Sequence, residues 1–283
     1  MRIAYQGEVG AFSEAAARRV HMDADLVACR SFEEVFEAVD AGPAHYGVLP
    51  IENSIGGSIH RNYDLLLEHT LPIVAEVELP VAHQLLALAG ATLAGLRRVY
   101  SHPQALAQCE RFLRTLAGVE IVASYDTAGS AKLVAAEGKL DAAAIASARA
   151  GEVFGLTPLA DGIQDFDDNI TRFIVIGRRP LDKRAADKTT VAFTVPNTPG
   201  SLFKALSVFA LRDVDLTKLE SRPIPGRPWE YLFYVDLAMA RDELRCGRAL
   251  AHLAEFAPML RVLGSYTSWK EREKQTAGVE AVS

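Results

Sequence analysis

The segment Arg2-Ile3-Ala4-Tyr5-Gln6-Gly7-Glu8-Val9-Gly10 sets the pattern that the first part of the chain repeats. Residues 2–5 are predicted to form a short strand and residues 6–10 a turn, and an alanine-rich helix follows near Ser13. The same order of strand and helix recurs as far as residue 176. Such alternation predicts an α/β fold with mostly parallel sheets.

Apolar runs mark the other strands of this region, and amphipathic runs mark its helices. Ser31 and Glu34 have the spacing of a capping box, and they open a helix that stops at Gly42. Pro103 falls in the first turn of a later helix, where its missing N–H is tolerated. The expected strands after the first are residues 46–51, 99–100, 120–125, 142–146 and 171–176.

Several helices are expected to begin, just after a strand, with small hydroxyl or amide side chains. These are Ser13, Asn53 with Ser54, Ser101, Thr127 and Ser147. N-capping explains each of them alone. Strand C-termini and helix N-termini also line one edge of such a sheet, and free helix N–H groups favour an anion such as a carboxylate. Both interpretations stay open at this point.

Beyond a polar linker at residues 178–188 the pattern changes. Strands are expected at residues 189–195, 215–220, 231–237 and 260–266, and helices at residues 200–210 and 242–256. This βαββαβ order is the α+β, ferredoxin-like arrangement. We therefore predict domains at residues 1–180 and 188–268, followed by a flexible tail at residues 269–283.

The composition excludes several classes of protein. Apolar residues make up 49% of the 283 residues and charged residues 23%, which is typical of globular chains long enough for two domains. A net charge of −6 gives no basic footprint for nucleic acid or for an anionic membrane. The N-terminus lacks a signal peptide, and no apolar run reaches membrane-spanning length, so a cytoplasmic location is expected.

Generic tests for catalytic and metal sites give little. Cys29, Cys109 and Cys246 show no CxxC spacing, so we expect buried free thiols, and no cluster has the spacing of metal ligands. His102 lies near a helix start and is interpreted as structural. The acidic run at residues 161–168 is interpreted as a solvated loop rather than a source of a general acid.

Three longer sequence segments indicate a protein family more specifically than these general patterns do. They are Pro50-Ile51-Glu52-Asn53-Ser54-Ile55-Gly56-Gly57-Ser58, Tyr100-Ser101-His102-Pro103-Gln104-Ala105-Leu106-Ala107-Gln108-Cys109, and Asp168-Asn169-Ile170-Thr171-Arg172-Phe173. They resemble the PIENSxxG, SHPQ and NxTRF motifs of prephenate dehydratases, and Gly7-x-x-Gly10-x-x-Ser13 and Ala144-Ile145-Ala146-Ser147 also fit. The resemblance implies a two-lobed, periplasmic-binding-protein-like catalytic domain. Its lobes would be residues 1–77 with 160–180, and residues 78–159, with the site in the cleft.

That family converts prephenate to phenylpyruvate without a cofactor, losing the ring carboxylate as carbon dioxide and the ring hydroxyl as water. The resemblance implies that Thr171 is a positioned hydrogen-bond donor to the departing hydroxyl. Arg172 would bind a substrate carboxylate, with an ordinary ion pair as the alternative, and Phe173 is expected to pack beneath the strand. The full set of expected substrate-binding residues is Ser13, Asn53, Ser54, Ser101, Gln104, Thr127, Arg172 and Phe173.

The C-terminal region resembles an ACT domain of phenylalanine-regulated dehydratases. Leu216-Thr217-Lys218-Leu219-Glu220-Ser221-Arg222-Pro223 contains the ESRP motif, and Gly200-Ser201-Leu202-Phe203 stands where the family usually has GALV. The resemblance implies that phenylalanine binds between two such domains of a homodimer or homotetramer; a purely structural dimerisation module is the alternative. The expected effector residues are Pro199, Gly200, Ser201, Leu202, Glu220, Ser221 and Arg222.

Two rival functions remain. An arogenate dehydratase would act on the amino-acid analogue of prephenate, and the sequence does not decide between an amino and a keto group. A non-catalytic amino-acid sensor is possible on the same scaffold. The intact Thr171-Arg172-Phe173 argues against the sensor.

Overall fold

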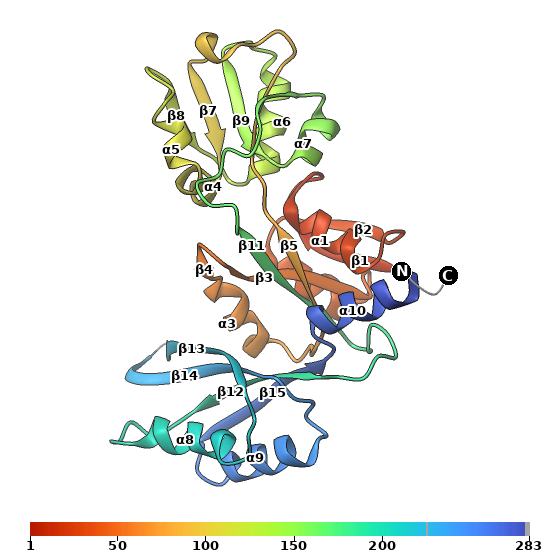
Figure 1. The fold of residues 1–283 in the computed structure, drawn as a ribbon, viewed down its shortest axis with the longest axis vertical. Helices are drawn as coiled ribbons and strands as arrows, with labels where there is room; N and C mark the ends of the chain where they lie inside the picture. Colours follow the sequence, from red (N-terminus) through yellow and green to blue (C-terminus); the bar gives the residue numbers. More distant parts are fainter. Residues whose placement is uncertain (225, 281–283) are drawn as a thin grey trace. The chain divides into compact units, whose positions relative to one another are not determined.

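A computed structural model of the chain describes residues 1–224 and 226–280. The chain divides into two compact units (Figure 1). The first unit is Met1–His69 with Val77–Val175, and the second is Thr70–Glu76 with the chain from Ile176 onward. The segment Thr70–Glu76 therefore belongs to the C-terminal unit, although it precedes most of the first unit in the sequence.

The first lobe of the first unit is an α/β layer built around β1, which pairs in parallel with β2 and β3. Helices α1 and α2 pack on β1. The buried face of α2 is apolar, whereas that of α1 combines Ala16 and Ala17 with the buried polar residues Ser13 and Glu14. The elements are β1 (Arg2–Gln6), α1 (Phe12–Val20), β2 (Asp25–Cys29), α2 (Phe32–Asp40), β3 (Tyr46–Asn53), β4 (Gly57–Ser58), α3 (His60–Glu68), β5 (Ile73–Pro80) and β11 (Ile170–Gly177).

The second lobe has a five-stranded sheet of order β10-β6-β9-β7-β8. Its central strand β9 is buried on both faces, so its side chains enter two cores in alternation: Ala144 packs with α6 and α7, and Ile145 packs near Cys109. The elements are β6 (Gln84–Ala87), η1 (Leu93–Gly95), β7 (Arg98–Ser101), α4 (Pro103–Gln108), α5 (Glu110–Leu113), β8 (Glu120–Ala123), α6 (Thr127–Glu137), β9 (Ala142–Ala146), α7 (Ala148–Phe154) and β10 (Thr157–Ala160).

The turn that opens the chain also contacts the second lobe. Ser147 Oγ donates a hydrogen bond of 2.7 Å to the carbonyl oxygen of Gly10. Gly10 has a φ of 91°, and a Cβ there would lie 2.8 Å from the Cα of Ala150. Glycine is therefore required at this position both for the backbone conformation and for the close approach.

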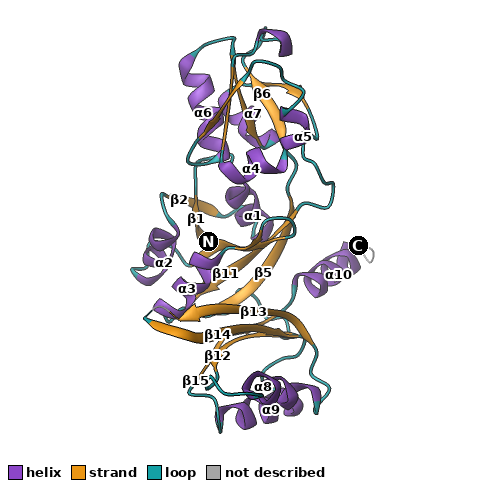
Figure 2. Ribbon diagram, turned by 90° about the vertical axis from the view of Figure 1, so that its left-hand side faces the viewer, coloured by secondary structure: helices purple, strands orange, loops and turns teal. Residues whose placement is uncertain are grey.

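The C-terminal unit contains the expected βαββαβ order, with an antiparallel sheet of order β13-β14-β12-β15. Helices α8 and α9 cover one face of this sheet (Figure 2). The core between them includes the stacked rings of Phe193 and Phe233, 5.6 Å apart. The elements are β12 (Lys188–Thr194), α8 (Ser201–Ala210), β13 (Leu216–Ile224), β14 (Arg227–Leu237), α9 (Leu244–Ala254), β15 (Met259–Tyr266) and α10 (Trp269–Glu280).

A buried ion cluster lies within this unit. Lys188 Nζ is 2.9 Å from a carboxylate oxygen of Glu76 and 3.5 Å from one of Asp236, and both carboxylate side chains are 3% exposed. Thr190 Oγ1 donates to Asp236 at 2.6 Å. The ammonium group thus lies beside two buried carboxylates, which also accept hydrogen bonds.

The fold class expected from the sequence is confirmed: a two-lobed α/β region of the periplasmic-binding-protein type precedes a ferredoxin-like α+β region. The flexible tail expected over residues 269–283 is instead the helix α10 as far as Glu280; residues 281–283 lie outside the described residues. The backbone N–H of Trp269 binds Glu76, and Arg272 pairs with Asp182 at 2.9 Å. These buried polar contacts give the helix a fixed start.

Two local expectations also change. The long helix expected after Pro103 is interrupted at Cys109, where α4 ends and α5 begins. The expected N-caps are confirmed only at Ser31 and Ser147, whose hydroxyls accept backbone N–H groups. The N-cap of α4 is His102, one residue after the expected Ser101, and the N-cap of α6 is Asp126, one residue before the expected Thr127. Ala11 precedes α1 and makes no side-chain cap. Asn53 and Ser54 lead into the short strand β4 rather than a helix.

Candidate active site

A cavity of about 420 Å³ lies in the first unit, with walls from both lobes. Predicted residues that line it are Ser13, Asn53, Gln104, Thr127, Thr171 and Phe173. Predicted residues that do not line it are Ser54, Ser101 and Arg172. The fold therefore brings together most of the expected set from segments far apart in the sequence.

The alternation of β11 separates the residues of the Thr171-Arg172-Phe173 string. Thr171 and Phe173 line the cavity, whereas successive side chains of a strand point to opposite faces. Arg172 instead lies 3.5 Å from a carboxylate oxygen of Glu52, and its side chain is 12% exposed. This placement agrees with the ion-pair alternative for Arg172 rather than with direct binding of a substrate carboxylate. Phe173 both packs beneath the strand, at 2% exposure, and forms part of the cavity wall.

Ser54 and Ser101 have structural contacts. Ser54 Oγ donates to the carbonyl of Asp168 at 2.7 Å and accepts from the N–H of Ile170 at 2.9 Å. Ser101 Oγ is buried and donates to the carbonyl of Ile145 at 2.7 Å. The first serine anchors the turn after β3 to β11, and the second anchors β7 to β9. The expected contact of either hydroxyl with substrate has no support in this geometry.

Three buried side-chain amides beside Thr171 form a closed cycle of hydrogen bonds. Asn53 Nδ2 donates to Asn169 Oδ1 at 2.7 Å, Asn169 Nδ2 donates to Gln108 Oε1 at 3.1 Å, and Gln108 Nε2 donates to Asn53 Oδ1 at 3.1 Å. We call this set, Asn53, Asn169 and Gln108, the amide cycle. Each member uses both ends of its amide, so none can rotate by 180° without breaking two bonds.

The orientation of Asn53 fixes the role of Thr171. Asn53 Oδ1 also accepts the backbone N–H groups of Ile55 and Gly56, at 3.1 and 2.7 Å. Its Nδ2 therefore faces Thr171 and donates to Thr171 Oγ1 at 3.0 Å. Because Thr171 Oγ1 accepts this hydrogen bond, its own proton is directed elsewhere, and Thr171 lines the cavity. The arrangement makes Thr171 a donor to a group bound there.

His83 is attached to the amide cycle and is 2% exposed. Its Nε2 lies 3.0 Å from Gln108 Oε1, which can only accept, so Nε2 carries the proton. Burial lowers the pKa of His83, opposed by the hydrogen bond to Gln108, and Nδ1 has no hydrogen-bond partner in the structure. The hydrogen bond from His83 Nε2 thus holds the side-chain amide of Gln108 in place.

Two further titratable groups lie in the cavity wall at helix starts. His102 Nδ1 accepts the backbone N–H of Gln104 at 3.2 Å, as the structural interpretation expected, but the ring also lines the cavity. Burial lowers the pKa of His102, and the nearby Asp126 carboxylate opposes this shift. Asp126 caps α6 by accepting the N–H of Gly129, and burial raises the pKa of Asp126.

Gln108, His83 and Asp126 were missed by the sequence reasoning. Gln108 lies one helical turn after Gln104, so the i, i+4 spacing within the quoted string could have found it. Asp126 could have been found as a stronger N-cap than Thr127. His83 carries no local signal. The thiols of Cys29, Cys109 and Cys246 are free and buried, as expected, and burial raises the pKa of Cys109 to about 12.

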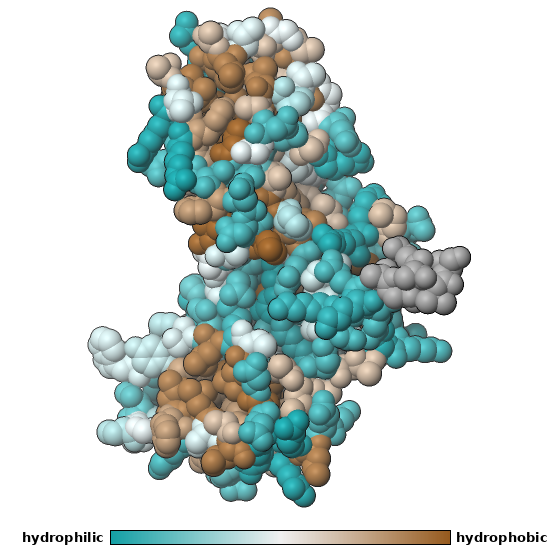
Figure 3. All heavy atoms as spheres, in the orientation of Figure 1, coloured by the Kyte–Doolittle hydropathy of each residue, from teal (hydrophilic) through white to brown (hydrophobic). Residues whose placement is uncertain are grey.

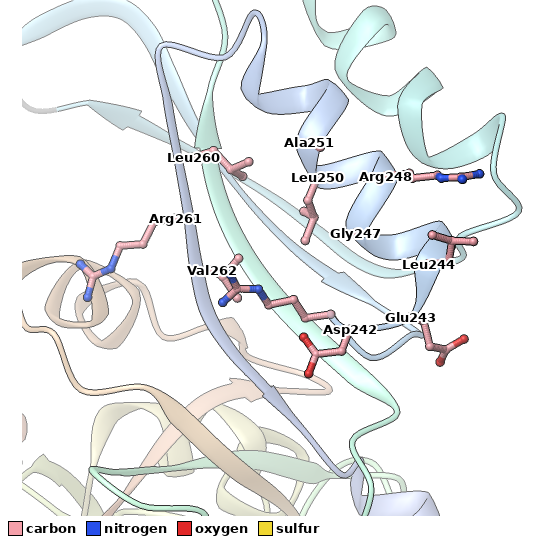
Figure 4. A pocket seen from close by; sticks show the side chains of 11 residues that line it. Asp242, Glu243, Leu244, Gly247, Arg248, Leu250, Ala251, Leu260, Arg261 and Val262 are labelled. Atoms are coloured by element: carbon pink, nitrogen blue, oxygen red, sulfur yellow. The ribbon is translucent and has the colours of Figure 1, made fainter.

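The expected effector residues lie in the C-terminal unit. Gly200 starts α8 with a φ of 82°, Ser201 Oγ lies 2.7 Å from Thr198 Oγ1, and Glu220 lies 3.6 Å from Lys218. A separate cavity of about 810 Å³ lies between α9 and β15, where Arg248, Arg261 and Val262 are among the lining residues (Figure 4). None of the expected effector residues lines that cavity. In the described part of the chain no helix is long and apolar enough to cross a membrane.

Comparison with known proteins agrees with this geometry. Residues 3–181 match the family model described as prephenate dehydratase, and residues 189–245 match the ACT domain. The chain belongs to the prephenate dehydratase family and carries an ACT domain after its catalytic region. It is accordingly a carbon–oxygen lyase, which removes the non-catalytic sensor as an alternative.

Individual relatives cover nearly the whole chain. Arogenate dehydratase/prephenate dehydratase 2, chloroplastic, of Arabidopsis thaliana is 50% identical over 277 residues, covering 94% of this chain and 72% of that protein. Prephenate dehydratase from Arthrobacter aurescens, solved with L-Phe, superimposes with a TM-score of 0.87 at 31% identity and covers 100% of this chain and 99% of that one. A structure titled GqqA, a novel type of quorum quenching acylases, has a TM-score of 0.85 at 36% identity, over 95% of this chain and 98% of that one.

These relatives correct one expectation. The cytoplasmic location inferred from the sequence is wrong on this comparison, because the similar Arabidopsis thaliana enzyme is named chloroplastic. The inference rested on the composition of the first residues of this chain. The amino-acid composition of these residues does not predict the compartment named for the similar Arabidopsis thaliana enzyme.

Proposed function

We propose that this chain catalyses the decarboxylative dehydration of prephenate to phenylpyruvate. The observation that carries the proposal is the hydrogen bond from Asn53 to Thr171 in the wall of the cavity. It leaves the Thr171 proton for the ring hydroxyl of the substrate. An alcohol is too weak an acid to protonate the hydroxyl fully, so Thr171 acts as a pre-oriented donor where negative charge develops.

The conversion of prephenate to phenylpyruvate, carbon dioxide and water consumes one proton. The bond from the ring to its carboxylate breaks, and its electron pair enters the ring as carbon dioxide leaves. The ring C–O bond breaks at the other end, and the departing hydroxide, hydrogen-bonded to Thr171, takes one proton from solvent and leaves as water. Aromatisation of the ring supplies the driving force. The residues of the chain are needed only to hold the substrate and to stabilise the leaving oxygen.

The composition of the cavity wall favours loss of the carboxylate. None of the described residues that line the cavity is an arginine or a lysine. A carboxylate bound there without an ion pair loses little electrostatic stabilisation when it becomes neutral carbon dioxide. Phe12, Phe32 and Phe173 supply apolar surface for the ring.

We further propose that phenylalanine regulates the enzyme through the ACT domains of an oligomer. The support is the ACT match and the L-Phe complex of the Arthrobacter aurescens relative. Apolar side chains gather on the visible face of the C-terminal unit (Figure 3). The exposed large hydrophobic residues of this unit include Phe203, Leu211 and Trp229. Such a surface is typical of subunit contacts. Glu220→Ala and Arg222→Ala are expected to abolish the effect of phenylalanine on turnover; unchanged inhibition in both contradicts this placement of the effector.

Arogenate is the second candidate substrate. It is favoured by the name of the Arabidopsis thaliana relative, which includes both activities. The direct test of the proposed function incubates the purified protein with prephenate and follows phenylpyruvate. Absence of product from folded protein, with either substrate, refutes the proposed function.

A further inference from the structure

Asp126 has an unusual environment within the cavity wall. Its Oδ1 accepts the N–H of Gly129, while its Oδ2 is buried and has no hydrogen-bond partner. The backbone N–H of Glu8 lowers the pKa of this carboxylate, although it makes no hydrogen bond to Oδ2. Buried carboxylate oxygens are normally paired, because an unpaired one loses its hydration without compensation. The N-cap role accounts for Oδ1 only and gives no reason for the burial of Oδ2 without a hydrogen bond.

Among the described residues, no lysine or arginine forms an ion pair with Asp126. Lys132, on the same helix, binds Glu8 at 3.1 Å instead. His102, the nearest basic side chain that acts on Asp126, has its own pKa lowered by burial. The hydroxyl of Tyr125 donates a hydrogen bond of 3.4 Å to Glu8 Oε1 and not to Asp126. The carboxylate of Asp126, a residue that lines the cavity, can therefore accept a hydrogen bond from a substrate group bound there.

The two candidate substrates differ in the charge of the side chain on their ring. Prephenate brings two carboxylates and no cation to a cavity whose wall contains Asp126 but neither arginine nor lysine. Arogenate brings the same two carboxylates together with an ammonium group. Two like charges in one poorly solvated site repel strongly, whereas an ammonium beside a carboxylate is stabilised. The charge balance favours arogenate.

The shape of the substrate agrees with this assignment. The ring hydroxyl lies para to the carbon that bears both the ring carboxylate and the side chain. When the hydroxyl contacts Thr171 on β11, the side chain extends from the opposite end of the ring. Asp126 belongs to the other lobe, at the start of α6. The two residues thus offer partners for the two ends of one substrate.

We propose that Asp126 determines substrate specificity by receiving the ammonium group of arogenate with its carboxylate, so that the site favours arogenate over prephenate. The inference rests on the proposed dehydratase function. An ammonium donates up to three hydrogen bonds, and a keto oxygen donates none. Asp126 therefore attracts the amino form and repels the keto form, and both effects contribute to discrimination.

The test compares kcat/KM for both substrates in the wild-type protein and in Asp126→Asn. Asparagine keeps an oxygen for Gly129 and removes only the charge, so the cap of α6 is preserved. We expect kcat/KM for arogenate to fall by about 10- to 100-fold, as for loss of a charge-assisted hydrogen bond. We expect kcat/KM for prephenate to rise, because an amide N–H replaces a repelling oxygen.

Two matched variants separate the possible failures. Ser31→Ala removes the N-cap of α2, outside the cavity, and should lower stability without changing the ratio of the two kcat/KM values. Thr171→Val should lower kcat for both substrates by about 10²- to 10³-fold. An unchanged ratio in folded Asp126→Asn, or a wild-type protein that strongly prefers prephenate, overturns the proposal for Asp126 and leaves the dehydratase function intact. A wild-type protein that converts neither substrate refutes the dehydratase function and the proposal together.

Discussion

Asn53 Nδ2 donates a hydrogen bond of 3.0 Å to Thr171 Oγ1, joining residues that are 118 positions apart in the sequence. The bond joins the end of β3 to the start of β11 and is supported by the amide cycle and by two backbone N–H groups. A hydroxyl that is required to accept from one side can donate only toward another. The direction of the Thr171 proton is thus set before substrate binds, as electrostatic preorganisation requires.

Thr171→Val should reduce kcat by about 10²- to 10³-fold, the usual cost of removing one donor to a developing negative charge. Valine has a similar shape, so the cavity should keep its form and KM should change little. Steady-state kinetics and the melting temperature measure the two effects. Thr157→Val on β10, outside the cavity, is the matched control and should keep full kcat. Near-normal turnover of Thr171→Val contradicts the assignment.

Gln108→Leu should lower both stability and kcat. It removes the acceptor of Asn169 Nδ2 and His83 Nε2, and each buried donor left unpaired costs about 1–3 kcal/mol. Urea unfolding measures the loss. Gln104→Leu, one turn earlier in the same cavity wall, should alter the stability by no more than about 0.5 kcal/mol, as a substitution outside the amide cycle. Equal stability of the two variants would show that the cycle is energetically unimportant.

Asp126 should impose a pH dependence with a defined sign. Burial raises its pKa in the folded protein above the value in the unfolded chain, so the folded state binds the proton more tightly. The contribution of Asp126 to stability is therefore present at low pH and is lost as the pH rises through its raised pKa. The pH dependence of unfolding measured from pH 3.5 to 7 should be weaker in Asp126→Asn. In the same range, arogenate turnover by the wild-type protein should rise with pH as the carboxylate ionises. A pH profile shared by both proteins refutes this role.

Lys188→Met should destabilise the C-terminal unit by about 3–5 kcal/mol, because it removes an ammonium group from beside two buried carboxylates. The control is Lys132→Met, whose ammonium pairs with Glu8 while its side chain is 54% exposed. An exposed pair contributes about 0–1 kcal/mol, so this variant should unfold almost like the wild type. Chemical denaturation followed by circular dichroism compares them. Similar midpoints for both variants would refute a structural role for the ion cluster of Lys188, Glu76 and Asp236.

Much of the fold was predictable because it depends on local patterns. The βαββαβ order and strands β1, β3, β7, β8, β9 and β11 were found from apolar runs and turn residues, and Pro103 indeed starts α4. Strands β2, β5, β6 and β10 were not predicted. The interruption at Cys109 and the helix α10 were not found. Their causes are tertiary, since Trp269 binds Glu76, which lies far from it in the sequence, and Arg272 binds Asp182.

The sequence by itself determined the class of the fold and contained the family strings, whose resemblance implied a role for Thr171. It did so because periodicity and motif spacing are properties of neighbouring residues. Only the tertiary structure decided which side chains face the cavity: Thr171 lies in its wall and Arg172 does not, because a strand alternates its faces. Likewise, the amide cycle and the unpaired oxygen of Asp126 depend on contacts between distant segments. Hydrogen-bond direction is decided by those contacts, and no local pattern encodes it.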